Sequence, residues 1–206
     1  MKSFRQDALV GMLCWLLLTG VAAIKDKATG IDFADKHNGM PILGVGVRSK
    51  GPIKVYSVGC YGPYGLKKSM AELSASGDKK KALQTLRNGA SKGPTTFLLK
   101  FNFKVNAEKV SSSLTDAVLA RFSASKDIGK LKTLLYDGVS AKGSADKGTK
   151  MQFDCSSGGV KVSLDGKHLG TVSNGGLAKA FCDVYLDDKT VSPSLRQNCL
   201  DNLCKP

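Results

Sequence analysis

The segment PILGVGVR (residues 41–48) is followed by SKGP (residues 49–52) and then by the apolar run IKVYSVGCY (residues 53–61). The two outer segments are rich in valine and isoleucine, which favour strands, and the Gly-Pro cluster between them interrupts a strand. We therefore predict an antiparallel hairpin of two strands. The rest of the fold is expected to form around this hairpin.

The first strand places two glycines and one arginine on a single face. Because successive side chains of a strand alternate, Gly44, Gly46 and Arg48 share that face. Glycine inside a strand often marks a place where a ligand or another backbone approaches closely, so Arg48 is a candidate for holding an anionic group. The alternative is an arginine at a solvated sheet edge, with glycines that relieve crowding. The opposite face is expected to carry Leu43, Val45 and Val47.

The second strand supplies two phenols, Tyr56 and Tyr61. A shift of one residue in the hairpin register moves every side chain to the other face of the sheet. Only one of the two tyrosines is therefore expected to share a face with Arg48. The sequence leaves open which tyrosine it is.

Periodic apolar residues predict the other elements. The segment 95–105 alternates as a half-buried strand does, and two glycine turns separate three later strands at the spacing of a meander. We expect strands at 95–105, 150–155, 160–164 and 167–172, and helices within 67–88, from Asn106, from Ser125 to Gly138, at 177–186 and after Ser192. This order predicts an α+β domain, in which an open antiparallel sheet packs against helices on one face.

The N-terminus has the features of a secretory signal in their usual order. Lys2 and Arg5 precede a mostly apolar run at residues 8–23, which is shorter than the roughly 20 residues that span a bilayer. An uncleaved anchor is the alternative. We expect a signal peptide at 1–23, an exposed lead-in at 24–40 and one domain at 41–206, in a protein of the secretory pathway that is secreted or lies in an organelle lumen.

The composition argues against two classes of partner. The formal net charge is +14, but the lysines are spread along the chain and no basic stretch is interleaved with aromatic residues. A solvated lysine-rich surface is favoured over a nucleic-acid site. His37 and His168 are far apart and no close cysteine pair exists, so we expect neither a metal nor another cofactor. The pairing of the cysteines after the signal is left open: Cys60, Cys155, Cys182, Cys199 and Cys204.

Three ordered segments together resemble the chalcone isomerase superfamily. They are the hairpin motif at 44–48 with its partner at 53–61, the late segment Asp183-Val184-Tyr185-Leu186, and Val191-Ser192-Pro193. The resemblance implies an open antiparallel sheet against a layer of helices, with a cleft between them. Enzymes of this family close a chalcone into a flavanone, whereas related proteins bind fatty acids without catalysis.

The resemblance assigns roles to particular residues. It places the arginine of the cleft at Arg48, and it places Tyr56 where the enzymes have a threonine, a change shared with the fatty-acid-binding branch. The helical Tyr and Asn pair of the enzymes falls at Asn106 and Ser113, and a hydroxyl residue of the enzymes falls at Val184. Losing one donor near a developing charge typically costs about a hundredfold or more in rate. Arg48 and Tyr56 are the catalytic candidates if the protein is an enzyme.

We expect a binding protein for a fatty acid or a similar apolar carboxylate. A phenolic ligand is the related possibility, and the alternative function is an intramolecular lyase of the chalcone isomerase type. A structural partner protein with a filled cleft is a third class. The candidate ligand-binding residues are Arg48, Tyr56, Tyr61, Ser113, Val184 and Tyr185.

Overall fold

The computed structural model describes residues 23–202. The signal peptide expected at 1–23 lies outside the described residues except for Ala23, and so does Cys204. Among the described residues, no helix has both the length and the apolar character needed to cross a membrane.

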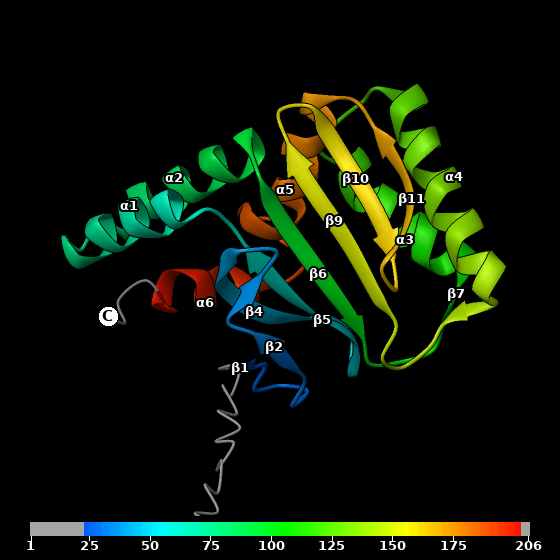
Figure 1. Ribbon diagram of the computed structural model, residues 1–206, viewed down its shortest axis with the longest axis horizontal. Helices are drawn as coiled ribbons and strands as arrows, with labels where there is room; N and C mark the ends of the chain where they lie inside the picture. Colours follow the sequence, from blue (N-terminus) through cyan, green and yellow to red (C-terminus); the bar gives the residue numbers. More distant parts are fainter. Residues whose placement is uncertain (1–22, 203–206) are drawn as a thin grey trace, which may run out of the picture.

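The described chain is built around a seven-stranded sheet in which every neighbouring pair is antiparallel (Figure 1). The strand order is β11-β10-β9-β6-β5-β4-β3. The strands are β3 (Lys36–His37), β4 (Met40–Lys50), β5 (Ile53–Tyr61), β6 (Thr95–Phe101), β9 (Lys150–Ser156), β10 (Gly159–Leu164) and β11 (Lys167–Val172). The expected hairpin and the expected meander are therefore both confirmed.

Helices pack on one face of this sheet, with α5 against β9 and β10 and α6 against β4 (Figure 1). They are α1 (Tyr64–Ala75), α2 (Lys79–Lys92), α3 (Ala107–Leu119), α4 (Ser125–Lys142), α5 (Gly175–Leu186) and α6 (Pro193–Asp201). Asp78 and Asn106 cap α2 and α3 as expected, because each side chain accepts a hydrogen bond from a backbone N–H of the first turn. The α+β class with helices on one face of an open sheet is confirmed.

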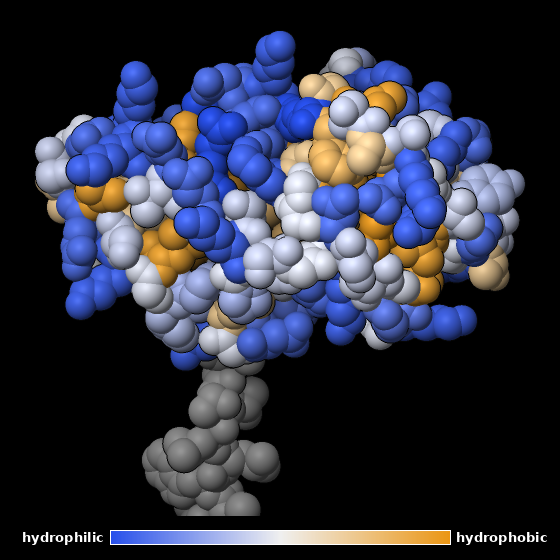
Figure 2. All heavy atoms as spheres, turned by 90° about the horizontal axis from the view of Figure 1, so that it is seen from above, coloured by the Kyte–Doolittle hydropathy of each residue, from blue (hydrophilic) through white to orange (hydrophobic). Residues whose placement is uncertain are grey.

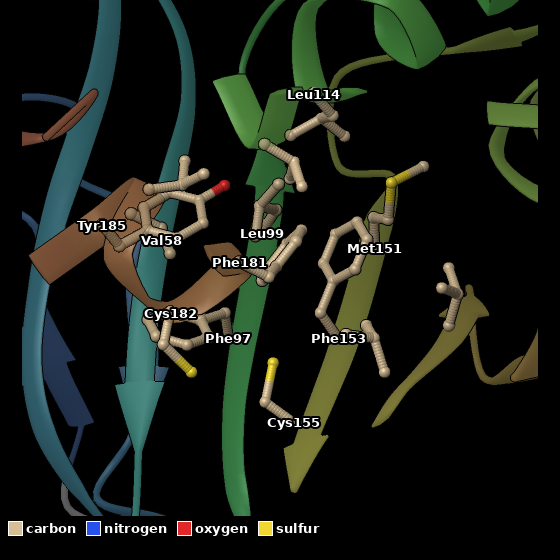
Figure 3. Close-up of a cluster of buried hydrophobic side chains, with 14 of the residues drawn as sticks. Val58, Phe97, Leu99, Leu114, Met151, Phe153, Cys155, Phe181, Cys182 and Tyr185 are labelled. Atoms are coloured by element: carbon tan, nitrogen blue, oxygen red, sulfur yellow. The ribbon is translucent and has the colours of Figure 1, made fainter. Parts of the chain in front are cut away.

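The main core lies between the sheet and the helices, and Figure 3 shows its centre. Phe153 of β9 stacks on Phe181 of α5 with ring centroids 4.3 Å apart, and Phe97 of β6 stacks on Tyr185 at 5.0 Å. Aromatic side chains bury large apolar areas, so these contacts fix how α5 sits on the sheet. The exposed surface is mainly hydrophilic with scattered hydrophobic patches, as Figure 2 shows for one face.

The segment 24–40 is not an exposed lead-in, which corrects the sequence-based expectation. It forms β1 (Ala23–Lys25) and β2 (Asp32–Ala34), which pair with each other, and it continues into β3. Phe33 is completely buried against the face of the sheet opposite the helices, and the Asp26 carboxylate accepts a 2.6 Å hydrogen bond from Ser57 of β5. One buried phenylalanine contributes about 1.5–3 kcal/mol, and it holds this polar segment on the sheet together with the β1–β2 pairing and the Asp26–Ser57 hydrogen bond.

Three elements end at other residues than expected. The strand predicted to reach Val105 ends at Phe101, and Phe103 is 53% exposed. The helices α2 and α4 continue past Gly89 and Gly138, where leucine side chains of other elements lie so close that a Cβ would clash. Tight packing offsets the low helix propensity of glycine, which costs about 1 kcal/mol. Two short strands, β7 (Val105–Asn106) and β8 (Ser144–Ala145), were not predicted.

The glycines of β4 accommodate α6. A Cβ added to Gly46 would lie 2.2 Å from Leu195 N, and one added to Gly44 would lie 2.7 Å from Cys199 N. The close approach predicted at these glycines is therefore that of a helix backbone. A bulge after Ile42 turns Leu43 toward the helices, so the expected common face of Leu43 and Val45 is wrong.

The helix α6 also covers the outer edge of β4. Val45 N–H donates to Asn198 Oδ1 over 2.8 Å, and Val47 N–H donates to Ser194 Oγ over 2.9 Å. Ser192 does not cap the helix through its side chain; its hydroxyl donates to Val47 O instead, over 2.9 Å. Unpaired strand edges invite intermolecular pairing, and these side chains satisfy the edge. These three hydrogen bonds also hold the segment before α6 beside Arg48.

Candidate functional site

A cavity of about 500 Å³ opens between the hairpin, the end of β6 and α3. Small-molecule sites usually occupy roughly 300–1,000 Å³, so this volume suits a small-molecule ligand. The elements that form it come together near the lower end of β6 in Figure 1. Its lining residues are Arg48, Lys50, Ile53, Val55, Tyr56, Phe101, Phe103, Lys104, Val105, Asn106, Lys109, Val110, Ser113, Leu114, Ala117, Val184 and Val191.

Arg48 is half-buried in the wall of this cavity. Its Nη1 donates a 3.2 Å hydrogen bond to the carbonyl of Val191, which lies just before α6. The other three arginines in residues 23–202 each form an ion pair with an aspartate, whereas Arg48 has no carboxylate partner there. Removing charge from water is costly unless it is paired. A half-buried arginine without an anion, in a cavity lined by no Asp or Glu, is a ready site for one.

Tyr56 lies directly opposite Arg48 in the hairpin register, so it is the tyrosine that shares the face of Arg48. Its hydroxyl is 3.0 Å from the hydroxyl of Tyr185 on α5. Burial raises the pKa of Tyr56, partly offset by the hydrogen bond from Tyr185 and by the charge of Arg48. Burial also raises the pKa of Tyr185 well above its usual value, with Tyr56 adding to the effect. Both phenols are thus protonated at neutral pH and act as hydrogen-bond donors.

The inner wall of the cavity is apolar. Phe101, Val110, Leu114 and Val184 line it and are each at most 5% exposed. Val184 stands where the resemblance placed a hydroxyl, and its side chain offers no donor. Asn106, which caps α3, and Ser113 of α3 line the outer part, and both are exposed. The inner part of the site therefore offers one arginine and one tyrosine hydroxyl beside an apolar wall.

Tyr61 does not belong to the site. It is completely buried on the other face of the sheet, and its hydroxyl donates to Ala34 O over 3.1 Å. Tyr185 does not line the cavity itself but contacts it through Tyr56. The structure thus brings together four of the six predicted residues, Arg48, Tyr56, Ser113 and Val184, and holds Tyr185 behind them.

Sequence reasoning missed the lysines of the cavity, which are Lys50, Lys104 and Lys109. The charged lysines are spread through the sequence, so nothing in their spacing marked these three. Lys142 in a second cleft, of about 520 Å³, is closely paired with Asp165, whereas Lys104 of the cavity lies 3.9 Å from Asp146. Within the part of the chain that the structure describes, no cluster of His, Cys, Asp or Glu has metal-binding geometry.

The comparisons with known proteins agree with this architecture. A family model described as chalcone isomerase-like matches residues 31–201. No curated protein matches the chain. Among solved structures, a fatty-acid binding protein of Arabidopsis thaliana superimposes with a TM-score of 0.72 at 20% sequence identity, covering 89% of this chain and 98% of that chain. The structural likeness at this identity speaks for the fold, and the family match spans most of the sequence. The chain therefore belongs to the chalcone isomerase-like family.

Proposed function

We propose that this protein binds a fatty acid or a similar apolar carboxylate in the cavity, with the carboxylate on Arg48 and the chain in the apolar interior. The observation that carries the proposal is the guanidinium of Arg48, which has no carboxylate partner in residues 23–202 and lies in a cavity that none of their acidic side chains lines. A similar fold in a protein described as fatty-acid binding supports the same assignment.

The head group is expected to contact two donors from neighbouring strands. Arg48 presents a planar fork that can take both carboxylate oxygens, and its bond to Val191 O holds the fork in place. The hydroxyl of Tyr56 can accept from Tyr185 and donate to the ligand, because both phenols are protonated. Hydrogen bonds to a charged group contribute about 1.5–3 kcal/mol, so the anchor accounts for a substantial part of the affinity.

The chain of the ligand would lie against the apolar inner wall. Phe101, Val110, Leu114 and Val184 come from β6, α3 and α5, so the wall is formed by side chains that are already ordered in the core. Each buried methylene of the ligand contributes about 0.8 kcal/mol. Affinity should therefore rise with chain length until the cavity is filled.

The test compares a fatty acid with the fatty alcohol of equal length by isothermal titration calorimetry. We expect the acid to bind more tightly than the alcohol. Arg48→Ala should lower the affinity for the acid by about 10- to 100-fold, which corresponds to about 1.5–3 kcal/mol. Arg48→Lys should restore only part of the affinity, since a point charge lacks the planar fork. Tyr56→Phe should weaken the binding free energy of the acid by about 1 kcal/mol, the contribution of one neutral hydrogen bond.

Tyr61→Phe is the matched control for Tyr56→Phe, because Tyr61 belongs to the same strand but to the opposite face. It should leave fatty-acid affinity unchanged. If acid and alcohol bind equally well, and Arg48→Ala changes neither, the carboxylate site does not exist. Mass spectrometry of small molecules that co-purify with the protein identifies the natural ligand.

A further inference from the structure

The rim of the cavity carries exposed apolar side chains. Ile53 at the start of β5 is 45% exposed, and Phe103 after β6 is 53% exposed. Both line the cavity, although one belongs to β5 and the other to the segment after β6. Single exposed apolar residues are common, but here two large ones line the same apolar cavity.

The same rim is positively charged. Lys50, Lys104 and Lys109 are exposed and line the cavity together with Ile53 and Phe103, and no acidic side chain of the described chain does so. The nearest counter-charge is weak, because Asp146 lies 3.9 Å from Lys104 and the Lys104 side chain is 76% exposed. Glu108 beside Lys109 is paired with Lys132 instead, at 3.2 Å. The rim therefore combines apolar tips with cations.

We propose that this rim, formed by Lys50, Ile53, Phe103, Lys104 and Lys109, docks on the surface of an anionic lipid bilayer. Apolar side chains that enter the head-group region and lysines that face anionic lipids together give reversible membrane attachment. The opening of the cavity would then face the bilayer, so a lipid chain passes between the two without crossing water. That last step rests on the proposed function, whereas the docking itself does not.

Vesicle co-sedimentation tests the charge requirement. The protein should bind vesicles of phosphatidylcholine with phosphatidylserine and not vesicles of phosphatidylcholine alone. Each rim lysine should raise the affinity for anionic vesicles about fivefold, which corresponds to about 1 kcal/mol. The triple change to glutamine at Lys50, Lys104 and Lys109 should therefore weaken vesicle binding about 100-fold. The matched control changes the exposed lysines 79, 80 and 81 of α2 to glutamine. At physiological salt the Debye length is about 8 Å, so distant lysines should matter little.

A second pair of variants tests the apolar tips. Ile53→Ser with Phe103→Ser should weaken vesicle binding about tenfold, whereas Leu119→Ser with Tyr136→Ser, which are similarly exposed on α3 and α4, should not. Phe103→Trp is a milder change, which serves if the double serine variant does not fold. The fluorescence emission of this tryptophan should shift to the blue with anionic vesicles and not with neutral ones. All variants carry the same N-terminal segment, so any membrane affinity of that segment cancels.

The outcomes separate this inference from the proposed function. Equal losses from the rim lysines and the α2 lysines, or no binding to anionic vesicles, would overturn the docking surface. If the protein does not bind anionic vesicles, an acidic protein is the remaining candidate partner for the rim. Docking that survives in Arg48→Ala, while fatty-acid affinity is lost, supports the rim as a separate surface. Fatty-acid binding without any docking overturns the rim alone.

Discussion

The close contact between α6 and β4 predicts a large effect for Gly46→Ala. A Cβ at this position lies 2.2 Å from Leu195 N and 2.5 Å from Leu195 Cα, both backbone atoms, so the helix itself must move. Overpacking costs about 1–3 kcal/mol, and the three side-chain hydrogen bonds from α6 to β4 contribute about 0.5–1.5 kcal/mol each. If the shift of the helix breaks all three bonds, the free energy of unfolding should fall by about 2.5–7.5 kcal/mol, measured by urea denaturation followed by circular dichroism.

Gly129→Ala in α4 is the matched control, because nothing lies within 4 Å of an added Cβ there. Alanine is favoured over glycine in a helix by about 1 kcal/mol, so this variant should be more stable than the natural protein. Gly46→Ala should also weaken fatty-acid binding, since α6 follows the Val191 carbonyl that holds Arg48. An unfolding midpoint for Gly46→Ala equal to that of the natural protein would show that α6 does not depend on this contact.

Four further predictions address the thiols, the acid response, catalysis and processing. The four cysteines Cys60, Cys155, Cys182 and Cys199 are free and buried. The pKa of Cys60 is raised well above its usual value by the neighbouring thiol of Cys199 and by burial, and the pKa of Cys155 is raised by burial and by the neighbouring thiol of Cys182. A thiol reagent should therefore modify these four cysteines only in denaturant. Burial opposes ionisation of Asp183, but hydrogen bonds from Arg87 and Lys179 outweigh this effect and lower the pKa of Asp183. The ionised Asp183 therefore stabilises the fold fully above the unfolded pKa of about 3.9, and this stabilisation is lost as pH falls through the lower folded pKa. Asp183→Asn should lower the free energy of unfolding by about 1–3 kcal/mol at pH 7, and the unfolding curves of the variant and the natural protein should converge at acid pH. Chalcone should not cyclise to flavanone above background, since Val184 offers no donor; stereoselective product that disappears in Arg48→Ala would contradict this. Intact mass of the purified native protein should place its N-terminus at Ile24, and retention of residues 1–23 would refute signal cleavage.

Local patterns were sufficient for most of the secondary structure. The hairpin at 41–61 and the meander at 150–172 followed from alternating apolar residues and glycine turns, and the caps at Asp78 and Asn106 followed from side chains that accept backbone N–H bonds. The errors arose where a distant contact decided the outcome. Phe33 is buried by a sheet face formed elsewhere in the chain, and α4 passes Gly138 because Leu169 packs against it.

The sequence by itself determined that Arg48 lies on a glycine-rich strand next to a strand with two tyrosines, and that the chain resembles a family with an arginine in its cleft. Only the tertiary structure decided that Tyr56 faces Arg48, that Tyr61 faces away, and that a helix fills the space above the glycines. Residues 143 positions apart, Arg48 and Val191, meet in one wall of the cavity. Alternation within a strand fixes relative faces, but strand register and helix packing depend on contacts between distant segments. The unpaired state of Arg48 is a property of that packing, because it depends on which carboxylates the fold brings near.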